Sequence, residues 1–464
     1  MKKPAGNYSR RKFIIQNSLA GTAAIIGMNF PHLSSPGSRE TGAPAILGGS
    51  PAWAPGQKPE WVKWPIWVPE TDEPRVLEVL RSGVWSEAKV VKEFENAWAK
   101  TIGARRCVTT VNGTNALICA LVNLDIGAGD EVIVPPYTFI ATIQAVLQTG
   151  AIPVFVDTDP ETFQIDAGKI EASITPRTRA ILPVHIAGLP ADMEQITAIA
   201  KRHNLVVVED ACQAWLAEIN HKKVGTFGNA GCFSFQNSKN IPIGEGGAVV
   251  SDDETFIDRC VSYHNFGISY GSMVDKMGPG ITMIGTKLRL TEYQAAMGLA
   301  QLKRLDTQTT TRNENAGYLR SRLMEIPGIT PYKLYDNVTR AAFHLFPFRY
   351  EKNEFAGLPK AGFLSALRAE GVPCSGGYDT LNDKPFIRHA FQTKNFKKMY
   401  SETELDYNKF LERNQCPEND RLCQEAVWFT QNLLLGSKTD MDYIASAIEK
   451  IHKNAGKIKK TDQK

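Results

Sequence analysis

The sequence has little of what marks a membrane anchor or a nucleic-acid partner. The apolar stretch from Leu19 to Met28 is ten residues long, whereas a helix that spans a bilayer needs about 20. The formal net charge over 464 residues is only +4, and part of it comes from the basic segments MKK and KNAGKIKKTDQK. Such a small basic excess gives no reason to expect nucleic acid as a partner. The 43% apolar and 22% charged residues are ordinary for a soluble globular protein. The length allows two or three domains of about 100–200 residues each.

Two further signatures are missing, a zinc-type cysteine pair and a dinucleotide fingerprint. None of the eight cysteines forms a Cys-x-x-Cys pair, so we expect no metal site. Cys416 and Cys423 are the one close pair and could form a disulfide in an exported protein, although buried free thiols are the expected state of most of the eight. The nearest glycine-rich segment, GAGDEV at 127–132, precedes an expected strand instead of following one. This position argues against a nicotinamide enzyme.

Residues 1–30 carry an export signature. Arg10 and Arg11 lie within Ser-Arg-Arg-Lys-Phe-Ile and precede the short apolar stretch, as in signals of the twin-arginine route. The alternative is a chance Arg-Arg in an irregular tail. No clear Ala-x-Ala cleavage site is present, and residues 31–43, PHLSSPGSRETGA, are expected to form a polar linker. The sequence thus predicts the Tat export machinery as a partner and a periplasmic location, or a cytoplasmic one if the signal is not used.

Short β-branched runs alternate with helix-like segments between about residues 100 and 260. The expected strands are EVIVPP (131–136), IPVFVDT (152–158), AILPVHI (180–186), LVVVEDA (205–211), GCFSF (231–235) and GAVVSD (247–252). Nearly continuous apolar runs of this length suit strands that are buried on both faces of a parallel sheet. Helices are expected at 192–204 and 309–326. The pattern predicts an α/β fold with a large domain at 44–308, a smaller α/β C-terminal domain at 309–455 and a basic tail at 456–464.

Two strand-end features suit a phosphate-bearing ligand. Glu209 and Asp210 end the run LVVVED, where ligands gather in open α/β sheets, although Asp210 alone would more often cap a turn. The turn Asn112-Gly113-Thr114-Asn115 opens an expected helix. The free amides and dipole of a helix start bind phosphate, although Thr and Asn are also ordinary helix caps.

Lys239 is the third feature, in the segment CFSFQNSKNIPIGEGGAVVSDD with Ser234 and Ser238 nearby. A buried lysine loses its charge readily and becomes nucleophilic. A phosphate cradle, a carboxylate, hydroxyls and a lysine amine together match pyridoxal phosphate, whose aldehyde reacts with a lysine and whose ring nitrogen needs an anionic partner.

At this point the sequence resembles the DegT/DnrJ/EryC1/StrS family of pyridoxal-phosphate aminotransferases, which make amino sugars and aminocyclitols. The resemblance covers about residues 45–453. The stretches that carry it include LRSGVWSEAKVVKEFENAWAKTIGA, NGTNAL, GDEVIVPPYTFIAT, VVEDACQA, FSFQNSKNIPIGEGGAVVSDD and KLRLTEYQAAMG. It implies fold type I, the aspartate-aminotransferase type, with a mostly parallel sheet.

The resemblance also implies roles for single residues. Lys239 is the catalytic Schiff-base lysine, and Asp210 pairs with the ring nitrogen of the cofactor. The other cofactor contacts implied are Gln213 at the ring oxygen, Thr114, Asn115 and Ser234 at the phosphate, and Phe139 stacked on the ring, where ordinary core packing is the alternative. The family forms homodimers with shared sites, and Lys287 and Arg289 are the candidates for contacts with substrate or across the subunits.

The chain departs from the family pattern at two places. Trp215-Leu216 stands where His-Gly is common, which places bulk near the substrate, and Gly228-Asn229 stands where Gly-Asp is common, which is expected to be structural. The segments GYDTLNDKPFIRHAF and CPENDRLCQEAVWFTQNLLLGS resemble the branch with inosose aminotransferases and aminohydroxybenzoate synthases. Members of that branch are normally cytoplasmic and carry similarly spaced cysteines, which argues against a Cys416–Cys423 disulfide.

These features together predict a transaminase. The amino donor is expected to be glutamate or glutamine, and the acceptor a keto-sugar or keto-cyclitol, free instead of nucleotide-linked. Trp215 could pack against the acceptor ring or belong to the core. The alternative function is an exported regulator or sensor that binds pyridoxal phosphate on the same fold without turnover.

Overall fold

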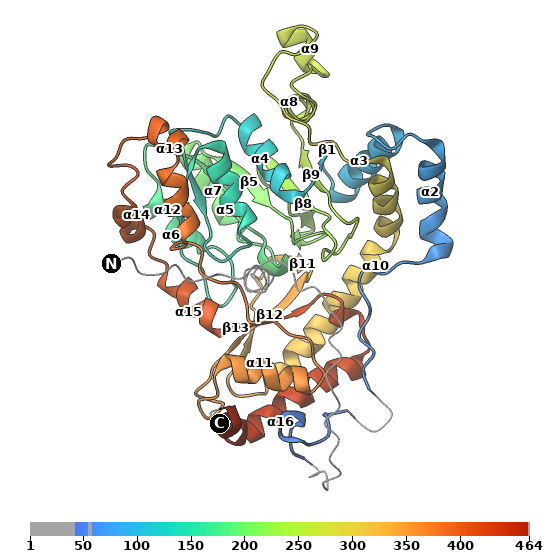
Figure 1. Ribbon diagram of the computed structural model, residues 1–464, viewed down its shortest axis with the longest axis vertical. Helices are drawn as coiled ribbons and strands as arrows, with labels where there is room; N and C mark the ends of the chain where they lie inside the picture. Colours follow the sequence, from blue (N-terminus) through green and yellow to red (C-terminus); the bar gives the residue numbers. More distant parts are fainter. Residues whose placement is uncertain (1–41, 54–57, 463–464) are drawn as a thin grey trace, which may run out of the picture. The chain divides into compact units, whose positions relative to one another are not determined.

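The central sheet has seven strands in the order β1-β9-β8-β5-β4-β2-β3 (Figure 1). The computed structural model describes residues 42–53 and 58–462, which lie in the unit Glu40–Lys464. The signal expected at 1–30, and the linker up to residue 41, lie outside the described residues. The strands are β1 (Arg106–Thr110), β2 (Glu131–Val134), β3 (Ile152–Phe155), β4 (Thr178–Ile181), β5 (Val206–Asp210), β8 (Ala230–Ser234) and β9 (Gly247–Ser251).

The sheet is mostly parallel, as predicted. Strands β3, β2, β4, β5 and β8 pair in parallel, whereas β9 is antiparallel to both β8 and β1. The six expected runs all form strands, and β1 is a seventh that the sequence reading missed. The fold is therefore of the α/β class, with the carboxyl ends of the parallel strands at one edge of the sheet.

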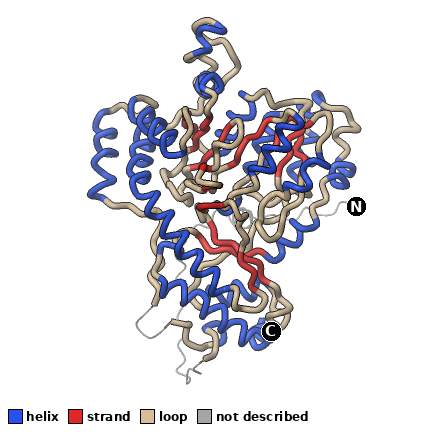
Figure 2. The backbone as a smooth tube through the Cα atoms, turned by 180° about the vertical axis from the view of Figure 1, so that it is seen from behind, coloured by secondary structure: helices blue, strands red, loops and turns tan. Residues whose placement is uncertain are grey.

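Apolar side chains alternate between the two faces of this sheet. Val208 and Val249 pack with α4 (Gly113–Asn123), α5 (Ala141–Thr149) and α8 (Glu254–His264). Their neighbours Val207 and Val250 pack on the other face with α3 (Lys89–Ile102) and α7 (Met193–His203). Because successive residues of a strand point to opposite faces, a continuous apolar run needs a helical layer on each side. Figures 1 and 2 show helices on both sides of the sheet.

The long helix α10 (Glu292–Leu323) leads from this layer to a second sheet. A capping box of Thr291 and Gln294 begins it, and it packs against α2 (Pro69–Ser82), α3 and α16 (Lys438–Asp462). The second sheet, β10 (Ile329–Pro331), β12 (Leu345–Tyr350) and β13 (Ala426–Thr430), lies beside α11 (Lys360–Ala369) and α16 (Figure 1). The expected helix at 309–326 is thus the second half of α10, and the expected boundary at 308/309 falls inside this helix. Residues 456–462, expected as a basic tail, continue α16.

A small three-stranded sheet connects the regions expected as separate domains. Strand β11 (Val338–Arg340) pairs with the hairpin of β6 (Glu218–Ile219) and β7 (Lys222–Lys223).

The remaining elements are α6 (Ala167–Ile170), α9 (Ser272–Met277), α12 (Pro385–Gln392), α13 (Lys394–Met399), α14 (Tyr407–Arg413), α15 (Pro417–Glu425) and short 3-10 helices at Ala45–Leu47, Glu171–Ser173, Ile186–Gly188 and Leu433–Leu435. The division into two domains stays a prediction.

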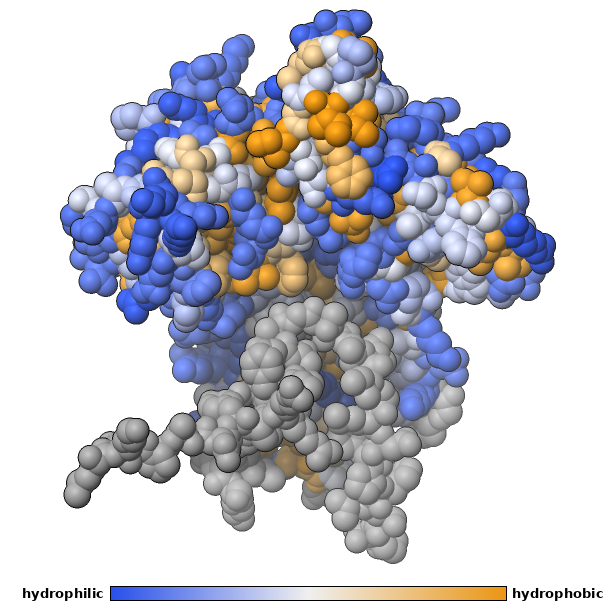
Figure 3. Space-filling model, turned by 45° about the horizontal axis from the view of Figure 1, so that its top comes forward, coloured by the Kyte–Doolittle hydropathy of each residue, from blue (hydrophilic) through white to orange (hydrophobic). Residues whose placement is uncertain are grey.

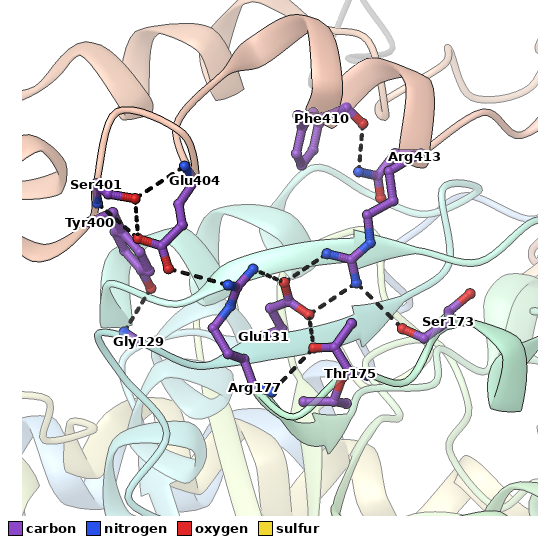
Figure 4. A network of polar contacts seen from close by, with 12 residues as sticks. Gly129, Glu131, Ser173, Thr175, Arg177, Tyr400, Ser401, Glu404, Phe410 and Arg413 are labelled. Carbon is purple, nitrogen blue, oxygen red and sulfur yellow. Dashed lines mark hydrogen bonds and ion pairs between the residues drawn. The ribbon is translucent and has the colours of Figure 1, made fainter.

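An ion-pair network fastens α14 to the start of β2 (Figure 4). The Glu131 carboxylate accepts hydrogen bonds from Arg413, at 2.7 and 3.0 Å, from Arg177 at 2.6 Å and from the Thr175 hydroxyl at 2.7 Å. Burial opposes ionisation, but these donors outweigh it and lower the pKa of Glu131 to about 2. Helix α14, which was expected to belong to the C-terminal domain, is therefore held against the central sheet.

All eight cysteines are free in the structure. Cys416 precedes α15 and Cys423 lies in its second turn, and their sulfur atoms contact Asn414 and Asn419 instead of each other. The expectation that this pair forms no disulfide is confirmed. Within 42–53 and 58–462, we find no helix with both the length and the apolar character needed to cross a membrane.

Candidate active site

The carboxyl ends of β5 and β8 and the amino end of α4 meet at one place. A Cβ atom on Gly113, the first residue of α4, would lie 2.7 Å from Cβ of Ser234 at the end of β8. The same atom would lie 2.8 Å from Sγ of Cys212, which follows β5. Only glycine permits this approach. The structure thus brings together three sequence features that were predicted to share a ligand.

The start of α4 has the donors that a phosphate group needs. Oδ1 of Asn112 accepts hydrogen bonds from the Asn115 backbone N–H at 2.9 Å and from its side-chain amide at 3.0 Å. Asn115 therefore serves the helix cap, which was the alternative to phosphate binding. Thr114 is partly exposed and Ser234 is buried at the strand end, so their hydroxyls lie beside the positive end of the helix dipole.

Lys239 lies in the tight loop between β8 and β9. Its backbone N–H donates to the Gln236 carbonyl at 2.8 Å, and its own carbonyl accepts from the Trp64 indole at 3.1 Å. Burial lowers the pKa of Lys239 below its usual value, while the nearby Cys212 and Asp210 raise it. A lysine with a lowered pKa has a larger neutral, nucleophilic fraction at neutral pH.

Two adjacent acids at the end of β5 serve different purposes. Glu209 is fully buried and accepts hydrogen bonds from three backbone N–H groups, those of Gly225, Phe227 and Gly228 at 2.6–2.7 Å. It also accepts one from Nε2 of His185 at 3.0 Å. Nδ1 of His185 accepts from the Ala191 N–H, so the ring proton lies on Nε2. Glu209 is therefore structural.

Asp210 points to the opposite face of the strand, as the alternation of side chains requires. Oδ2 accepts a hydrogen bond from Thr142 Oγ1 at 2.8 Å, and Oδ1 accepts one from the Cys212 N–H at 3.2 Å. The second bond is the turn-capping role that was the alternative for Asp210. The first holds the carboxylate beside the start of α5, so Asp210 both caps the turn and presents an anion near Lys239.

Gln213 is held at both ends of its side-chain amide. Oε1 accepts from the Ala187 N–H at 2.8 Å, and Nε2 donates to the Tyr378 hydroxyl at 2.9 Å. Tyr378 comes from the segment after α11, so the C-terminal half of the chain reaches the site here. This fixed amide lies three residues after Asp210, where the resemblance places a contact with the cofactor's ring oxygen.

Phe139 is not a core residue. Its side chain is 42% exposed in the loop between β2 and α5, and its carbonyl accepts from the Thr142 N–H. Because Thr142 also contacts Asp210, this loop lies next to the predicted ring site. The structure thus disfavours core packing, the alternative for Phe139.

Three remaining candidates have different surroundings. Trp215 is fully buried, which favours the core alternative over a surface that packs on the substrate, although its ring centroid lies 5.9 Å from Lys239 Nζ. Lys287 is exposed and pairs with Asn265 in an isolated bridge. Arg289 lies within electrostatic range of Glu87 and His264. The described contacts do not join Lys287 or Arg289 to the Lys239 group.

The side chains gathered here fit pyridoxal phosphate. Lys239 could supply the amine, Asp210 an anion for the ring nitrogen, and the start of α4 donors for the phosphate. The DegT/DnrJ/EryC1/StrS aminotransferase family model matches residues 68–448, which is most of the chain. The chain belongs to this family. It is a pyridoxal-phosphate-dependent aminotransferase of fold type I.

Similar proteins include aminocyclitol and amino-sugar enzymes. The chain is 32% identical over 411 residues to L-glutamine:2-deoxy-scyllo-inosose aminotransferase from Streptoalloteichus tenebrarius, covering 85% of this chain and 96% of the relative. It is 41% identical over 252 residues to GDP-perosamine synthase from Caulobacter vibrioides, covering 54% and 67% of the two chains. The crystal structure of 3-amino-5-hydroxybenzoic acid synthase superimposes with a TM-score of 0.73 at 30% identity, covering 85% of this chain and 98% of that one.

The structure explains one departure from the family pattern and adds residues that were missed. Asn229 exchanges hydrogen bonds with both the N–H and the carbonyl of Val207, so this departure is structural as expected. Sequence reasoning missed Thr142, Tyr378 and Trp64. Thr142 lies within the quoted stretch GDEVIVPPYTFIAT, but only the fold places it against Asp210.

Proposed function

We propose that this aminotransferase moves an amino group from L-glutamine or L-glutamate to the keto group of a cyclitol or sugar. The observation that carries the proposal is the gathering of Lys239, Asp210 and the α4 phosphate cradle in a chain that resembles, over 85% of its length, an enzyme that uses glutamine and 2-deoxy-scyllo-inosose. A sensor that binds the same cofactor could keep both residues, so the enzyme is favoured by the aminotransferase family and its named aminotransferase relatives, and turnover with an amino donor tests the choice.

The residues have separate tasks in this reaction. Pyridoxal phosphate, when bound, supplies an aldehyde that receives the amino group and a ring that accepts an electron pair. Nζ of Lys239 would take a proton from the donor carbon as a base and give it, as an acid, to the carbon that carried the cofactor's aldehyde; its lowered pKa favours the neutral amine that the first step needs. Asp210 holds the proton on the ring nitrogen, and Thr142 keeps this carboxylate in place. The amides at the start of α4, with Thr114 and Ser234, hold the phosphate.

We propose further that the acceptor is a free keto-cyclitol or keto-sugar. The C-terminal segments that resemble the inosose branch support this choice, although the partial likeness to a GDP-perosamine synthase makes a nucleotide-linked acceptor the alternative. Tyr378 and Trp428 add support, because both are partly exposed and their ring centroids lie 4.7 Å apart beside Gln213. Flat aromatic faces pack well on the apolar face of a cyclic polyol.

A comparison of kcat/KM tests the acceptor. The measurement uses scyllo-inosose and a nucleotide-linked 4-keto sugar, with L-glutamine as the donor in both. We expect the free ring to be preferred by at least about tenfold, or about 1.4 kcal/mol in transition-state binding. A preference of the same size for the nucleotide sugar would reverse the choice. Trp428→Ala should lower kcat/KM for the preferred acceptor only.

We also propose a homodimer, as the family resemblance implies. Apolar side chains are exposed around the projecting segment of α8 and α9 (Figure 3), among them Phe266, Ile268, Val274, Met277, Ile281 and Ile284. Ile281 is 75% exposed and Ile284 is 90% exposed. A patch of this kind suits a protein partner, and a second copy is the simplest one. Light scattering should give a dimer for the wild type and a monomer for an Ile281→Asp, Ile284→Asp double variant.

Finally, we propose export by the twin-arginine route to the periplasm. The support is the segment Ser-Arg-Arg-Lys-Phe-Ile at residues 9–14 with the short apolar stretch after it. This route carries folded proteins, which suits an enzyme that loads its cofactor in the cytoplasm.

A further inference from the structure

Trp215 faces the reactive amine from a fully buried position. Nζ of Lys239 lies over its ring, 5.9 Å from the ring centroid, and the Trp215 side chain has no exposed surface. The indole nitrogen Nε1 is also buried and has no hydrogen-bond partner within 42–53 and 58–462. The indole therefore meets Lys239 through the face of its ring and not through its N–H group.

The backbone around Trp215 is a tight turn that follows β5. The Ala214 N–H donates to the Ala211 carbonyl at 2.9 Å. Leu216 has a φ of 60°, in the left-handed region that favours glycine, and its side chain is nevertheless buried. The His344 ring packs edge-to-face with the indole, with the ring centroids 5.7 Å apart. This strained turn and this packing hold the ring in one orientation beside the lysine.

A protonated amine on Lys239 has few groups that stabilise its charge. Burial lowers the pKa of Lys239, while the nearby Cys212 and Asp210 raise it. The Asp210 carboxylate is also the anion proposed for the cofactor's ring nitrogen, so it serves two positive groups in the loaded enzyme. Burial, together with the charges of Lys239 and Arg312, lowers the pKa of His344 well below its usual value, so this ring is neutral.

Arg312 on α10 opposes a positive charge at the lysine. Its guanidinium is fully buried, and burial lowers its pKa to about 9, which leaves it protonated at neutral pH. The Trp64 indole lies over this guanidinium at 5.5 Å and donates to the Lys239 carbonyl at 3.1 Å, so the two cations are near neighbours. Like charges disfavour each other. Among the described residues, Trp215 offers the ring face that lies within cation–π distance of the Lys239 amine.

We propose that Trp215 is a positioning residue that holds the protonated amine of Lys239 between the two proton transfers. The inference rests on the proposed function, in which this amine takes a proton from one carbon and gives it to another. At the first carbon a C–H bond breaks, its electron pair passes toward the cofactor's ring, and an N–H bond forms at Nζ. At the second carbon the same changes run in reverse.

Between these transfers the lysine is a cation in a buried place. The face of an indole attracts a cation more strongly where water is excluded, and it attracts a neutral amine much less. Trp215 thus favours the acid form of Lys239 that the second transfer needs, whereas burial favours the neutral form that the first transfer needs.

The pyridoxamine-phosphate form of the enzyme allows a direct measurement, because the amine of Lys239 is free in it. The rate at which acetic anhydride acetylates Lys239 is followed by mass spectrometry from about pH 6 to about pH 11, which gives the pKa of this amine. Suppression of a stop codon at position 215 introduces singly or triply fluorinated tryptophan, which draws electrons from the ring face at nearly constant volume. We expect the pKa of Lys239 to fall in steps, by at least about 0.5 with the triply fluorinated ring.

Trp215→Leu separates a cation–π contact from the exclusion of water by the sign of its effect. Loss of the ring face should lower the pKa of Lys239 by at least about 0.5, and Trp215→Phe should lie between leucine and wild type. If Trp215 only excludes water, the smaller leucine would admit water, and the pKa would rise because water stabilises the ammonium ion. The acid limb of the first half-reaction needs the neutral amine, so it should move to lower pH together with the pKa. The fluorinated series carries the test if Trp215→Leu does not fold.

Trp98 is the matched control. It is also fully buried, and its Nε1 has no partner in the described part of the chain, but its ring packs against Phe233 and Phe235. Fluorinated tryptophan at position 98 should leave the pKa of Lys239 unchanged. An unchanged or raised pKa of Lys239 in the variants at position 215 would overturn the proposal and make Trp215 a packing residue. The labelling uses neither donor nor acceptor, so this outcome is distinct from a failure of amino transfer to scyllo-inosose, which would refute the acceptor.

Discussion

Thr142 Oγ1 donates a hydrogen bond of 2.8 Å to Oδ2 of Asp210, which joins the start of α5 to the end of β5. The Thr142 hydroxyl has one proton and gives it to the carboxylate, so the contact of 2.8 Å between Thr138 and Thr142 must have Thr138 as the donor. Two hydroxyls in series therefore support the anion that is proposed to face the cofactor's ring nitrogen. Substitution of Asp210 and of Thr142 therefore tests the role of this carboxylate directly.

Asp210→Asn should keep the fold and reduce kcat by at least about 100-fold, or about 2.7 kcal/mol in the barrier, because an amide cannot hold the ring nitrogen protonated. Thr142→Val removes one hydrogen bond to the charged group at nearly constant volume and should reduce kcat by about tenfold. Both variants are compared with wild type by steady-state kinetics and by cofactor absorbance. Unchanged kinetics in Asp210→Asn would leave only the turn-capping bond to the Cys212 N–H as its role.

The ion-pair network of Glu131 should make stability depend on pH. The folded-state pKa is lowered from 4.5 to about 2, so the contribution of Glu131 is complete above about pH 4.5 and is lost as the pH falls toward 2. A shift of this size corresponds to at most about 3.4 kcal/mol, since each pKa unit is about 1.4 kcal/mol. Glu131→Gln should lower Tm at neutral pH, and the difference in Tm between this variant and wild type should become smaller in acid.

Glu78→Gln is the control for this measurement, because Glu78 forms an exposed pair with Arg75 and should have almost no effect on Tm. Thermal unfolding followed by circular dichroism at pH 7 and at about pH 3 gives the difference in Tm between each variant and wild type at both pH values. A gap between Glu131→Gln and wild type that stays constant, or widens in acid, would show that the network does not act through the charge of Glu131.

Export by the twin-arginine route predicts a simple defect. Replacing Arg10 and Arg11 by lysine should retain the enzyme in the cytoplasm, with its cofactor bound, because the route reads the arginine pair and not the charge. Cell fractionation followed by an activity assay measures the distribution. Normal export of the double-lysine variant would leave residues 1–30 without the proposed role.

Much of the site could be predicted because its signals are local in sequence. Lys239 is marked by its glycine-rich loop, and Asp210 by its place at the end of a buried strand. Contacts that depend on packing could not be predicted. Thr142 and Asp210 are 68 residues apart, and Arg312 lies on a helix whose periodicity does not distinguish a buried guanidinium from an exposed one. For Trp215 the sequence left open whether it packs on the acceptor ring or belongs to the core, and its complete burial, which depends on residues distant in the sequence, favours the core.

In the fold, too, elements with local sequence signals could be predicted, whereas those that depend on pairing with distant residues could not. The six expected strands are local apolar runs, whereas β1, RCVTT, is short and polar in part and becomes a strand by pairing with β9. The capping box at Thr291 begins α10 well before the expected start at 309, and no glycine or proline ends the helix at 308. The side chains of Arg413 and Asn414 form hydrogen bonds with β2 and β3. Their partners lie 282 and 259 positions away in the sequence, so local sequence patterns could not reveal these contacts.

The central claim is that Lys239 carries amino transfer from an amino acid to a keto-cyclitol, and one isotope experiment tests it most directly. Holoenzyme is incubated with scyllo-inosose and L-glutamine that is labelled at its α-amino nitrogen, and the product is analysed by mass spectrometry. We expect labelled aminocyclitol from the wild type and a rate at least about 1,000-fold lower from Lys239→Ala, which loses the group that moves the proton. Labelled product from Lys239→Ala at a rate near that of wild type would contradict the account. So would the absence of labelled product from wild-type enzyme whose cofactor is bound.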